Sequence, residues 1–178
     1  MTFLVYLLLV IGIMLLVNGL MQPKTFRVYR AISINAPGKD VYPLIADLKH
    51  WDNWSPWAQK DPNMRKDYSS PSTESGAYYR WSGNKDVGKG QMTIVDTIPD
   101  KNVALKLDIE APFEAHNDVV LSLESENGTS TVTWAMTGSQ NFFMRVMSFA
   151  FNMDKMVGSD FESGLENLKQ LAERAESE

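Results

Sequence analysis

Residues 141–175 read NFFMRVMSFAFNMDKMVGSDFESGLENLKQLAERA, and this stretch decides how the rest of the chain can fold. Its polar side chains recur every three or four positions, and its apolar side chains lie on the opposite side of a helical wheel. Because no proline follows Pro112, nothing interrupts this pattern. We therefore predict one amphipathic helix over residues 141–175, about 50 Å long at ~1.5 Å per residue. A helix of that length needs a broad apolar surface to lie on.

The apolar face of this helix changes character along its length. Its first half carries phenylalanine and methionine, which adapt to irregular space, and its second half carries leucine, which packs regular cores. Two interpretations stay open: the first half lines a cavity, or the whole face belongs to a filled core. On the first interpretation the helix supplies the wall residues Met147, Ala150, Phe151 and Met153.

Two glycines, Gly158 and Gly164, fall inside the predicted helix. Glycine in a helix interior costs about 1 kcal/mol relative to alanine. We therefore expect a strand or a bulky tryptophan to approach the helix closely at these positions.

Residues 25–139 supply the surface that the helix needs. Their apolar and polar side chains alternate, as expected for strands that bury one face, and Asn127-Gly128 is typical of a tight hairpin turn. Two short helices are predicted after the first strand, over residues 37–47 and within 49–62. Short links between the later strands indicate an antiparallel sheet of about seven strands. The fold class is therefore α+β.

Aromatic and methionine side chains mark the face of the strands that would meet the helix. The candidates for a ligand-binding wall on this face are Tyr79, Trp81, Met92, Asn117, Trp134 and Met136. Trp51, Trp54 and Trp57 follow the first strand at three-residue spacing. Such a cluster either caps a small core or walls a ligand pocket. On the second interpretation Trp54 and Trp57 close one end of the pocket.

Three charged residues lie beside the predicted apolar faces, where they could serve as polar or acid-base groups of a site. Arg30 lies in the apolar phase of the first strand, which indicates a bulge, an exposed strand end or an arginine that reaches into a polar pocket. Asp154 and Asp160 flank the apolar stripe of the helix. A desolvated carboxylate there would have a raised pKa and could act as an acid or base, whereas one at the helix border would be hydrogen-bonded or solvated. His116 is expected on the outer face of its strand, beside Asp118.

Composition excludes several classes of function. The chain has 178 residues and a net charge of −5, which argues against a general nucleic-acid-binding protein. It has no cysteine and two histidines, so we expect neither a cysteine-based metal site nor a histidine-rich one, and no cofactor. No Ser/His/Asp or Cys/His constellation can be assembled, so we expect no catalytic residues and leave enzymatic activity open.

Residues 3–21 are almost continuously apolar and carry no charge. As a helix they would span about 28 Å, close to the ~30 Å hydrocarbon core of a bilayer. A cleaved signal peptide would show a basic start, a shorter apolar run and a small-residue cleavage site, and these features are missing. We therefore expect a single-pass transmembrane anchor over residues 1–22, followed by a domain over 23–175. Lys24, Arg27 and Arg30 follow the run and weakly favour the cytoplasmic side for the domain.

Several motifs resemble the START-like SRPBCC superfamily. Its opening is similar to Ile32-x-Ile34-x-Ala36-Pro37 followed by Val41-Tyr42. Its polyketide cyclase/dehydrase-like branch is similar to Asp47-Leu48-x-x-Trp51-x-x-Trp54-Ser55-Pro56-Trp57 and to Gly158-x-Asp160-Phe161-Glu162-x-Gly164-Leu165-x-x-Leu168-Lys169. The resemblance runs from about Phe26 to Leu171 and implies the helix-grip fold, in which a curved antiparallel sheet wraps a long helix over a deep apolar cavity. It also implies a bacterial source.

The resemblance implies a function as well. Similar proteins are mostly binders of small molecules or lipids, and a minority are cyclases. We therefore expect a membrane-anchored domain that binds an apolar small molecule or lipid between the sheet and the helix, with the bilayer as its second partner. The alternative is an enzyme of the polyketide cyclase or dehydratase kind that uses polar groups in the same cavity. A structural domain with a filled core is the third possibility.

Overall fold

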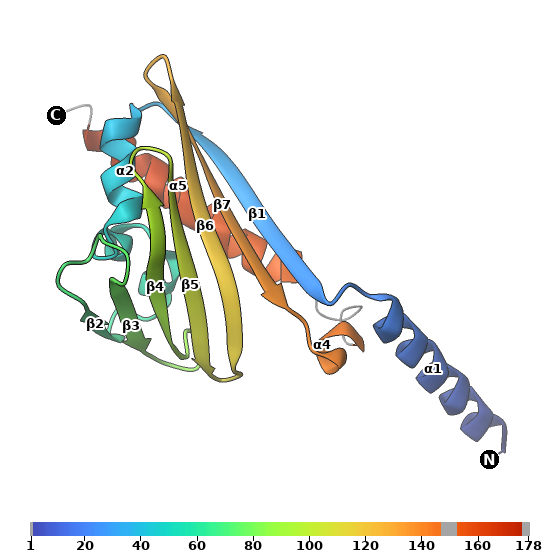
Figure 1. Cartoon of the computed structure of the whole chain (residues 1–178). Helices are drawn as coiled ribbons and strands as arrows, with labels where there is room; N and C mark the ends of the chain where they lie inside the picture. Colours follow the sequence, from blue (N-terminus) through green and yellow to red (C-terminus); the bar gives the residue numbers. More distant parts are fainter. Residues whose placement is uncertain (1, 147–152, 176–178) are drawn as a thin grey trace.

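The centre of the molecule is a seven-stranded antiparallel sheet (Figure 1). The structure, a computed structural model, describes residues 2–146 and 153–175. The strands lie in the order β1-β7-β6-β5-β4-β3-β2, so that only β1 departs from a simple meander. Their bounds are β1 (Thr25–Ile34), β2 (Arg65–Tyr68), β3 (Tyr78–Ser82), β4 (Lys89–Ile98), β5 (Asn102–Ala111), β6 (Ala115–Glu126) and β7 (Thr129–Ser139). The predicted α+β class and antiparallel sheet are confirmed.

The alternation in the sequence sets the register of the sheet. On β5 and β6 the residues Val103, Leu105, Val119 and Leu121 are buried while their neighbours in sequence are less so, since successive side chains point to opposite faces. At the β6–β7 turn Asn127 and Gly128 have φ angles of 52° and 81°, as the predicted tight hairpin requires. A register shift in β4 bends the sheet locally.

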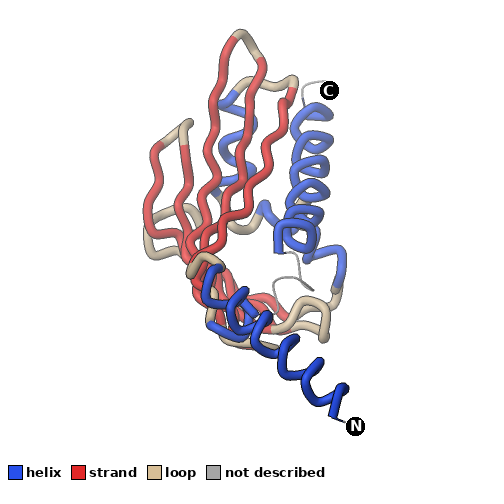
Figure 2. The backbone as a smooth tube through the Cα atoms, turned by 90° about the vertical axis from the view of Figure 1, so that its right-hand side faces the viewer, coloured by secondary structure: helices blue, strands red, loops and turns tan. Residues whose placement is uncertain are grey.

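Short helices follow β1, as predicted, and a long helix lies beside the sheet. The short ones are α2 (Gly38–Ala46), the 3₁₀ helix η1 (His50–Asn53) and α3 (Pro56–Lys60). The long helix α5 (Met153–Ala175) runs alongside the curved sheet, as Figure 2 shows, and packs against β1. Its buried face includes Phe161, Leu165 and Leu168, which recur at helical spacing. This is the helix-grip arrangement.

The helix predicted over residues 141–175 appears as two described helices. The first, α4 (Phe142–Val146), lies beside the helix α1 (Thr2–Met21), whereas α5 begins at Met153 (Figure 1). The continuity that the sequence predicts through residues 147–152 lies outside the described residues, as do the predicted wall residues Met147, Ala150 and Phe151.

An aromatic cluster joins the short helices to the sheet and to α5. The rings of Trp134 on β7 and Phe161 on α5 stack with their centroids 4.3 Å apart, and Trp54 meets Trp134 edge-on at 5.2 Å. The indole of Trp51 donates a hydrogen bond to the carbonyl oxygen of Ile45 at 3.0 Å. That of Trp54 donates to the carbonyl oxygen of Leu44 at 2.9 Å. Both indole N–H groups are thus satisfied inside the core.

At Gly164 the backbone of α5 lies close to this cluster. A Cβ atom on Gly164 would lie 2.9 Å from Cζ3 of Trp134 and 3.0 Å from Cδ of Pro56. At Gly158 a Cβ atom would lie 2.1 Å from the Nη2 atom of Arg30. The expected close approach is therefore present at both glycines, with a tryptophan and a proline at one and an arginine on a strand at the other.

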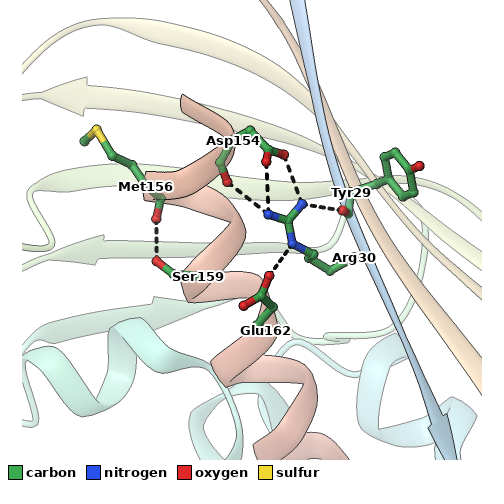
Figure 3. Close-up of polar contacts among 6 residues, drawn as sticks. All are labelled: Tyr29, Arg30, Asp154, Met156, Ser159 and Glu162. Atoms are coloured by element: carbon green, nitrogen blue, oxygen red, sulfur yellow. Dashed lines mark hydrogen bonds and ion pairs between the residues drawn. The ribbon is translucent and has the colours of Figure 1, made fainter. Parts of the chain in front are cut away.

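Arg30 holds the first turns of α5 against β1 (Figure 3). Its guanidinium donates to the Asp154 carboxylate at 3.0 and 3.2 Å and to Glu162 at 2.5 Å. It also donates to the carbonyl oxygens of Tyr29 and Asp154 at 2.8 and 3.2 Å. Of the three alternatives for Arg30, the bulge and the exposed strand end are wrong, whereas the side chain does point inward and reaches polar groups. β1 pairs regularly with β7 through this position, with Arg30 opposite Trp134, and the side chain reaches a neighbouring helix instead of a pocket.

The apolar helix α1 stands at the end of the sheet where β1 begins (Figure 1). Within the described residues, Phe3–Met21 is the one helical stretch long and apolar enough to cross a membrane. Nearly all of its large apolar side chains are exposed. Gly19, near the end of α1, is buried because Val146 of α4 packs against it. A Cβ atom on Gly19 would lie 2.4 Å from Cγ2 of Val146.

Candidate functional site: an apolar cavity between sheet and helix

A cavity of about 510 Å³ lies between the concave face of the sheet and the beginning of α5. Its size falls in the range of about 300–1,000 Å³ that is usual for sites that bind small molecules. Eight of the residues expected in a ligand-binding wall line it: Trp57, Tyr79, Trp81, Met92, Asn117, Trp134, Met136 and Met153. That these residues bind a ligand stays a prediction.

Trp54 does not line the cavity, contrary to expectation. Its side chain has no exposed surface, because it packs behind Trp51 at a centroid distance of 4.8 Å and beside Trp134. Trp51 takes its place in the wall together with Trp57. The segment with the three tryptophans therefore combines the two expected roles. Trp54 caps the core, and Trp57 forms part of the cavity wall.

Further wall residues were not singled out from the sequence. They are Phe26, Met64, Leu107, Ile109, Val157 and Phe161. Alternation in β1 and β5 predicts that Phe26, Leu107 and Ile109 point inward, but the pattern does not separate inward residues that line a void from those that fill a core. Val157 and Phe161 extend the wall along α5, and the fully buried Leu165 and Leu168 follow. The predicted change from a cavity half to a core half is thus present within α5.

Aromatic stacking fixes the side wall of the cavity. Tyr79 lies between Tyr68 and Trp81, with ring centroids 4.9 and 5.6 Å away. Burial raises the pKa values of Tyr68 and Tyr79 above the ordinary value of a phenol. The Tyr79 hydroxyl therefore stays protonated at neutral pH. The Trp81 indole N–H donates to the carbonyl oxygen of Val87 at 3.0 Å, so that its ring is held by the turn after β3.

Asn117, like Ser55, is a buried polar side chain of the wall. It is 7% exposed, and the hydrogen bonds of the described residues do not include one from its side-chain amide. It faces Gly138 across the β6–β7 ladder, where a Cβ atom would lie 2.0 Å from the Asn117 Oδ1 atom and 2.6 Å from the Phe26 ring. Gly138 thus provides the space that the amide occupies. The arrangement offers a polar group to a ligand inside an otherwise apolar wall.

The two carboxylates considered as acid or base lie at the borders of α5. Asp154 is exposed, and its hydrogen bonds to Arg30 lower its pKa, so the raised pKa considered for it is wrong. Asp160 lines the cavity, and both of its carboxylate oxygens accept hydrogen bonds from Nζ of Lys60 at 2.7 Å. Asp160 is therefore a paired carboxylate at the edge of the wall.

The mouth of the cavity lies where strands end. The wall residues Lys85, Asp86 and Glu114 are exposed and belong to the β3–β4 and β5–β6 turns. His116 is exposed too, as predicted, but its partners are Asp108 at 2.7 Å and Glu114 at 3.4 Å, not Asp118. The hydrogen bond to Asp108 raises the pKa of His116.

Within residues 2–146 and 153–175 no three His, Asp or Glu side chains come together in a way that could hold a metal ion. The site that the described residues build is thus an apolar cavity. Its polar groups include the buried Asn117 amide, the Asp160 carboxylate paired with Lys60, and exposed charged side chains at the mouth.

The curved sheet, the long helix and the cavity between them define a helix-grip domain of the SRPBCC superfamily. The chain belongs to the family described as polyketide cyclase/dehydrase and lipid transport, whose model matches residues 25–173. No curated protein matches the chain.

Solved structures show the same fold. A protein from Chromobacterium violaceum is 14% identical with a TM-score of 0.59, and the match covers 85% of this chain and 99% of that one. A protein from Mesorhizobium loti is 16% identical with a TM-score of 0.60, covering 84% and 98%. DynU16, from the dynemicin biosynthetic locus, is 13% identical with a TM-score of 0.58, covering 83% of this chain and 47% of that one.

Proposed function

We propose that this protein is a membrane-anchored binding protein that holds an apolar small molecule or a lipid in the cavity between the sheet and α5. The observation that carries the proposal is the cavity of about 510 Å³ with a mostly apolar, aromatic-rich wall. A filled structural core would not leave such a volume, because protein interiors pack with few voids larger than a water molecule. Membership of a family described as including lipid transport supports the same function.

The binding energy would come from burying apolar surface, at about 25 cal/mol per Å² removed from water. Such a wall accepts a range of apolar ligands. Selectivity would come from Asn117, which lacks a hydrogen-bond partner among the described residues and would pair with a carbonyl or hydroxyl group of the ligand. The Tyr79 hydroxyl is a second candidate. Arg30 is engaged by α5 and does not line the cavity.

Membrane residence is the second part of the proposal. The exposed apolar side chains of α1 need an apolar environment, and a stretch of 19 residues can cross a bilayer of ~30 Å. In this arrangement residues 1–22 form the anchor and residues 23–175 the binding domain. The cytoplasmic side for the domain stays a prediction from the basic residues after α1.

An enzyme of the cyclase or dehydratase kind is the alternative, and one observation favours it: Asp160 lies on the cavity wall. Its ion pair with Lys60 is the difficulty, because both carboxylate oxygens already accept hydrogen bonds from Nζ of Lys60. Replacing Asp160 by asparagine separates the two functions. Binding should survive the change, whereas a reaction that uses the carboxylate should stop.

An inventory of bound molecules tests the proposal. We expect mass spectrometry of the protein purified in detergent to find an apolar small molecule or lipid enriched over the same preparation of the Ala115→Trp variant. Ala115 lines the cavity, so an indole there would occupy part of it and obstruct a ligand. Val120→Trp, on the outer face of the same strand, is the matched control and should retain the molecule. Equal inventories from all three proteins would contradict the proposal.

A further inference from the structure

The mouth of the cavity and the apolar helix α1 lie at the same end of the sheet. Antiparallel pairing brings the β3–β4 turn, the β5–β6 turn and the end of β7 to this end, and residues of all three segments line the mouth. β1 begins here as well, after the three-residue link 22–24 that follows the end of α1 at Met21. The opposite end carries the β6–β7 hairpin (Figure 1).

Helix α4 is held at the depth of the last turn of α1. Gly19 is buried against Val146, and a Cβ atom on Gly19 would lie 2.4 Å from its Cγ2 atom, so the two helices touch. Because Gly19 belongs to the stretch that would cross the bilayer, a helix that touches it lies at or below the membrane surface. On its other side α4 supplies Met144 to the cavity wall. It therefore connects the proposed anchor directly to the mouth.

Exposed aromatic side chains flank the mouth on two sides. On α4 the exposed fractions are 45% for Phe142 and 70% for Phe143, and on the β5–β6 turn Phe113 is 81% exposed. Their neighbours Met144 and Pro112 line the cavity. Exposed phenylalanines on short segments next to a membrane-spanning helix are suited to burial in the interface between headgroups and acyl chains. Lys24, exposed in the link between α1 and β1, would meet anionic headgroups.

We propose that α4 and the β5–β6 turn insert into the surface of the bilayer that holds α1, so that the mouth opens onto the lipid and the cavity exchanges its ligand with the membrane. The inference rests on the proposed function, because it uses α1 as an anchor and the cavity as a ligand site. It adds a docking surface, formed by Phe113, Phe142 and Phe143, and a route for the ligand.

Single spin labels on the full chain test the docking surface. The chain has no cysteine, so Phe113→Cys, Phe143→Cys, Leu9→Cys and Glu126→Cys each give one labelling position without further change. The protein is reconstituted in vesicles of phosphatidylcholine and phosphatidylglycerol, and collisions with oxygen and with a water-soluble nickel chelate are compared. Labels at 113 and 143 should favour oxygen over nickel, close to the label at 9 in α1. The label at 126, on the far hairpin, should favour nickel.

The outcomes separate the docking from the proposed function. If the labels at 113 and 143 are accessible to nickel and the label at 9 is buried, the docking is overturned but the membrane anchor is still supported. A nickel-accessible label at 9 would overturn the anchor and the docking together. Buried labels at 9, 113 and 143 support both.

Loading of the cavity gives a second, independent measurement. Transfer of a fluorescent fatty acid from vesicles should slow at least about tenfold in the Phe113→Asp/Phe143→Asp double variant, because charged side chains are costly in the apolar interface. Its equilibrium affinity in detergent should match that of the wild type, because neither residue lines the cavity. Equal loading rates would overturn the docking, and a wild-type protein that takes up no ligand would overturn the proposed function and the exchange with it.

Discussion

Arg30 shows what a charged side chain does in the apolar phase of a strand. It spans from β1 to two carboxylates on α5, and Gly158 leaves room for its guanidinium. The partners lie 124 and 132 residues away in sequence, so no local pattern could identify them. Sequence alternation placed the arginine on the inward side correctly but could not say what it would meet.

Replacing Arg30 by methionine should lower the melting temperature of the protein at neutral pH, because Asp154 and Glu162 lose their partner. In the folded protein the pKa of Asp154 is lowered. Its pairing therefore stabilises the fold above the ordinary aspartate pKa of about 3.9 and is lost as the pH falls through the lower folded value. The difference in melting temperature between wild type and Arg30→Met should shrink in that acidic range. A difference independent of pH would mean that Arg30 acts through packing alone.

Asn117 is the residue at which ligand selectivity should be visible. Asn117→Leu should weaken binding of ligands with a carbonyl or hydroxyl group by about 2- to 12-fold, the effect of losing one hydrogen bond worth ~0.5–1.5 kcal/mol. Binding of a pure hydrocarbon probe should be unchanged or tighter. Calorimetric titration of both ligand types into both proteins measures this. Equal losses of affinity for the two ligand types would show that Asn117 shapes the cavity but forms no hydrogen bond with the ligand.

At the scale of elements, α5 lines the cavity with its first turns and fills the core with its later turns. Its beginning lines the cavity with Met153, Val157 and Phe161, and its later turns bury Leu165 and Leu168 completely. The change from methionine and phenylalanine to leucine predicts this division, because adaptable side chains suit a void and leucine suits a regular core. Where the void ends cannot be predicted from such a pattern, since it depends on the aromatic cluster of the facing strand.

Gly164 tests how tightly α5 lies on that cluster. Gly164→Leu should lower the free energy of unfolding by roughly 1–3 kcal/mol, because the added side chain collides with Trp134 and Pro56, which are both buried. Gly164→Ala should also destabilise. Ser163→Ala, at the neighbouring exposed position, is the control and should leave stability nearly unchanged or slightly raise it. A higher melting temperature for Gly164→Ala would show that helix propensity outweighs the contact.

At the scale of the whole molecule, the sheet and its register were predictable but the boundary between core and cavity was not. A period of two fixes which side chains of β5 and β6 point inward, and Asn127-Gly128 fixes one turn. Trp51 and Trp54, three residues apart on one short segment, could not be told apart. One lines the cavity and the other is enclosed, and only the packing of Trp134 between them and α5 decides this.

The anchor should be separable from the binding domain. The full chain should sediment with membranes, whereas a chain that begins at Pro23 should be soluble and folded, because the core of the sheet does not use residues of α1. Sedimentation after cell lysis and circular dichroism of the shortened chain measure the two properties. Recovery from cells of a mature protein that begins near Gln22 would contradict the anchor and show a cleaved signal.

The central claim is that the cavity takes up an apolar ligand, and calorimetric titration of the chain from Pro23 with oleic acid tests it most directly. The account predicts saturation at about one equivalent. It also predicts weaker uptake in Ala115→Trp, whose indole obstructs the cavity, and unchanged uptake in Val120→Trp, which changes the outer face of the same strand. The absence of saturable uptake by the folded wild-type domain, or equal uptake by both variants, would contradict the claim.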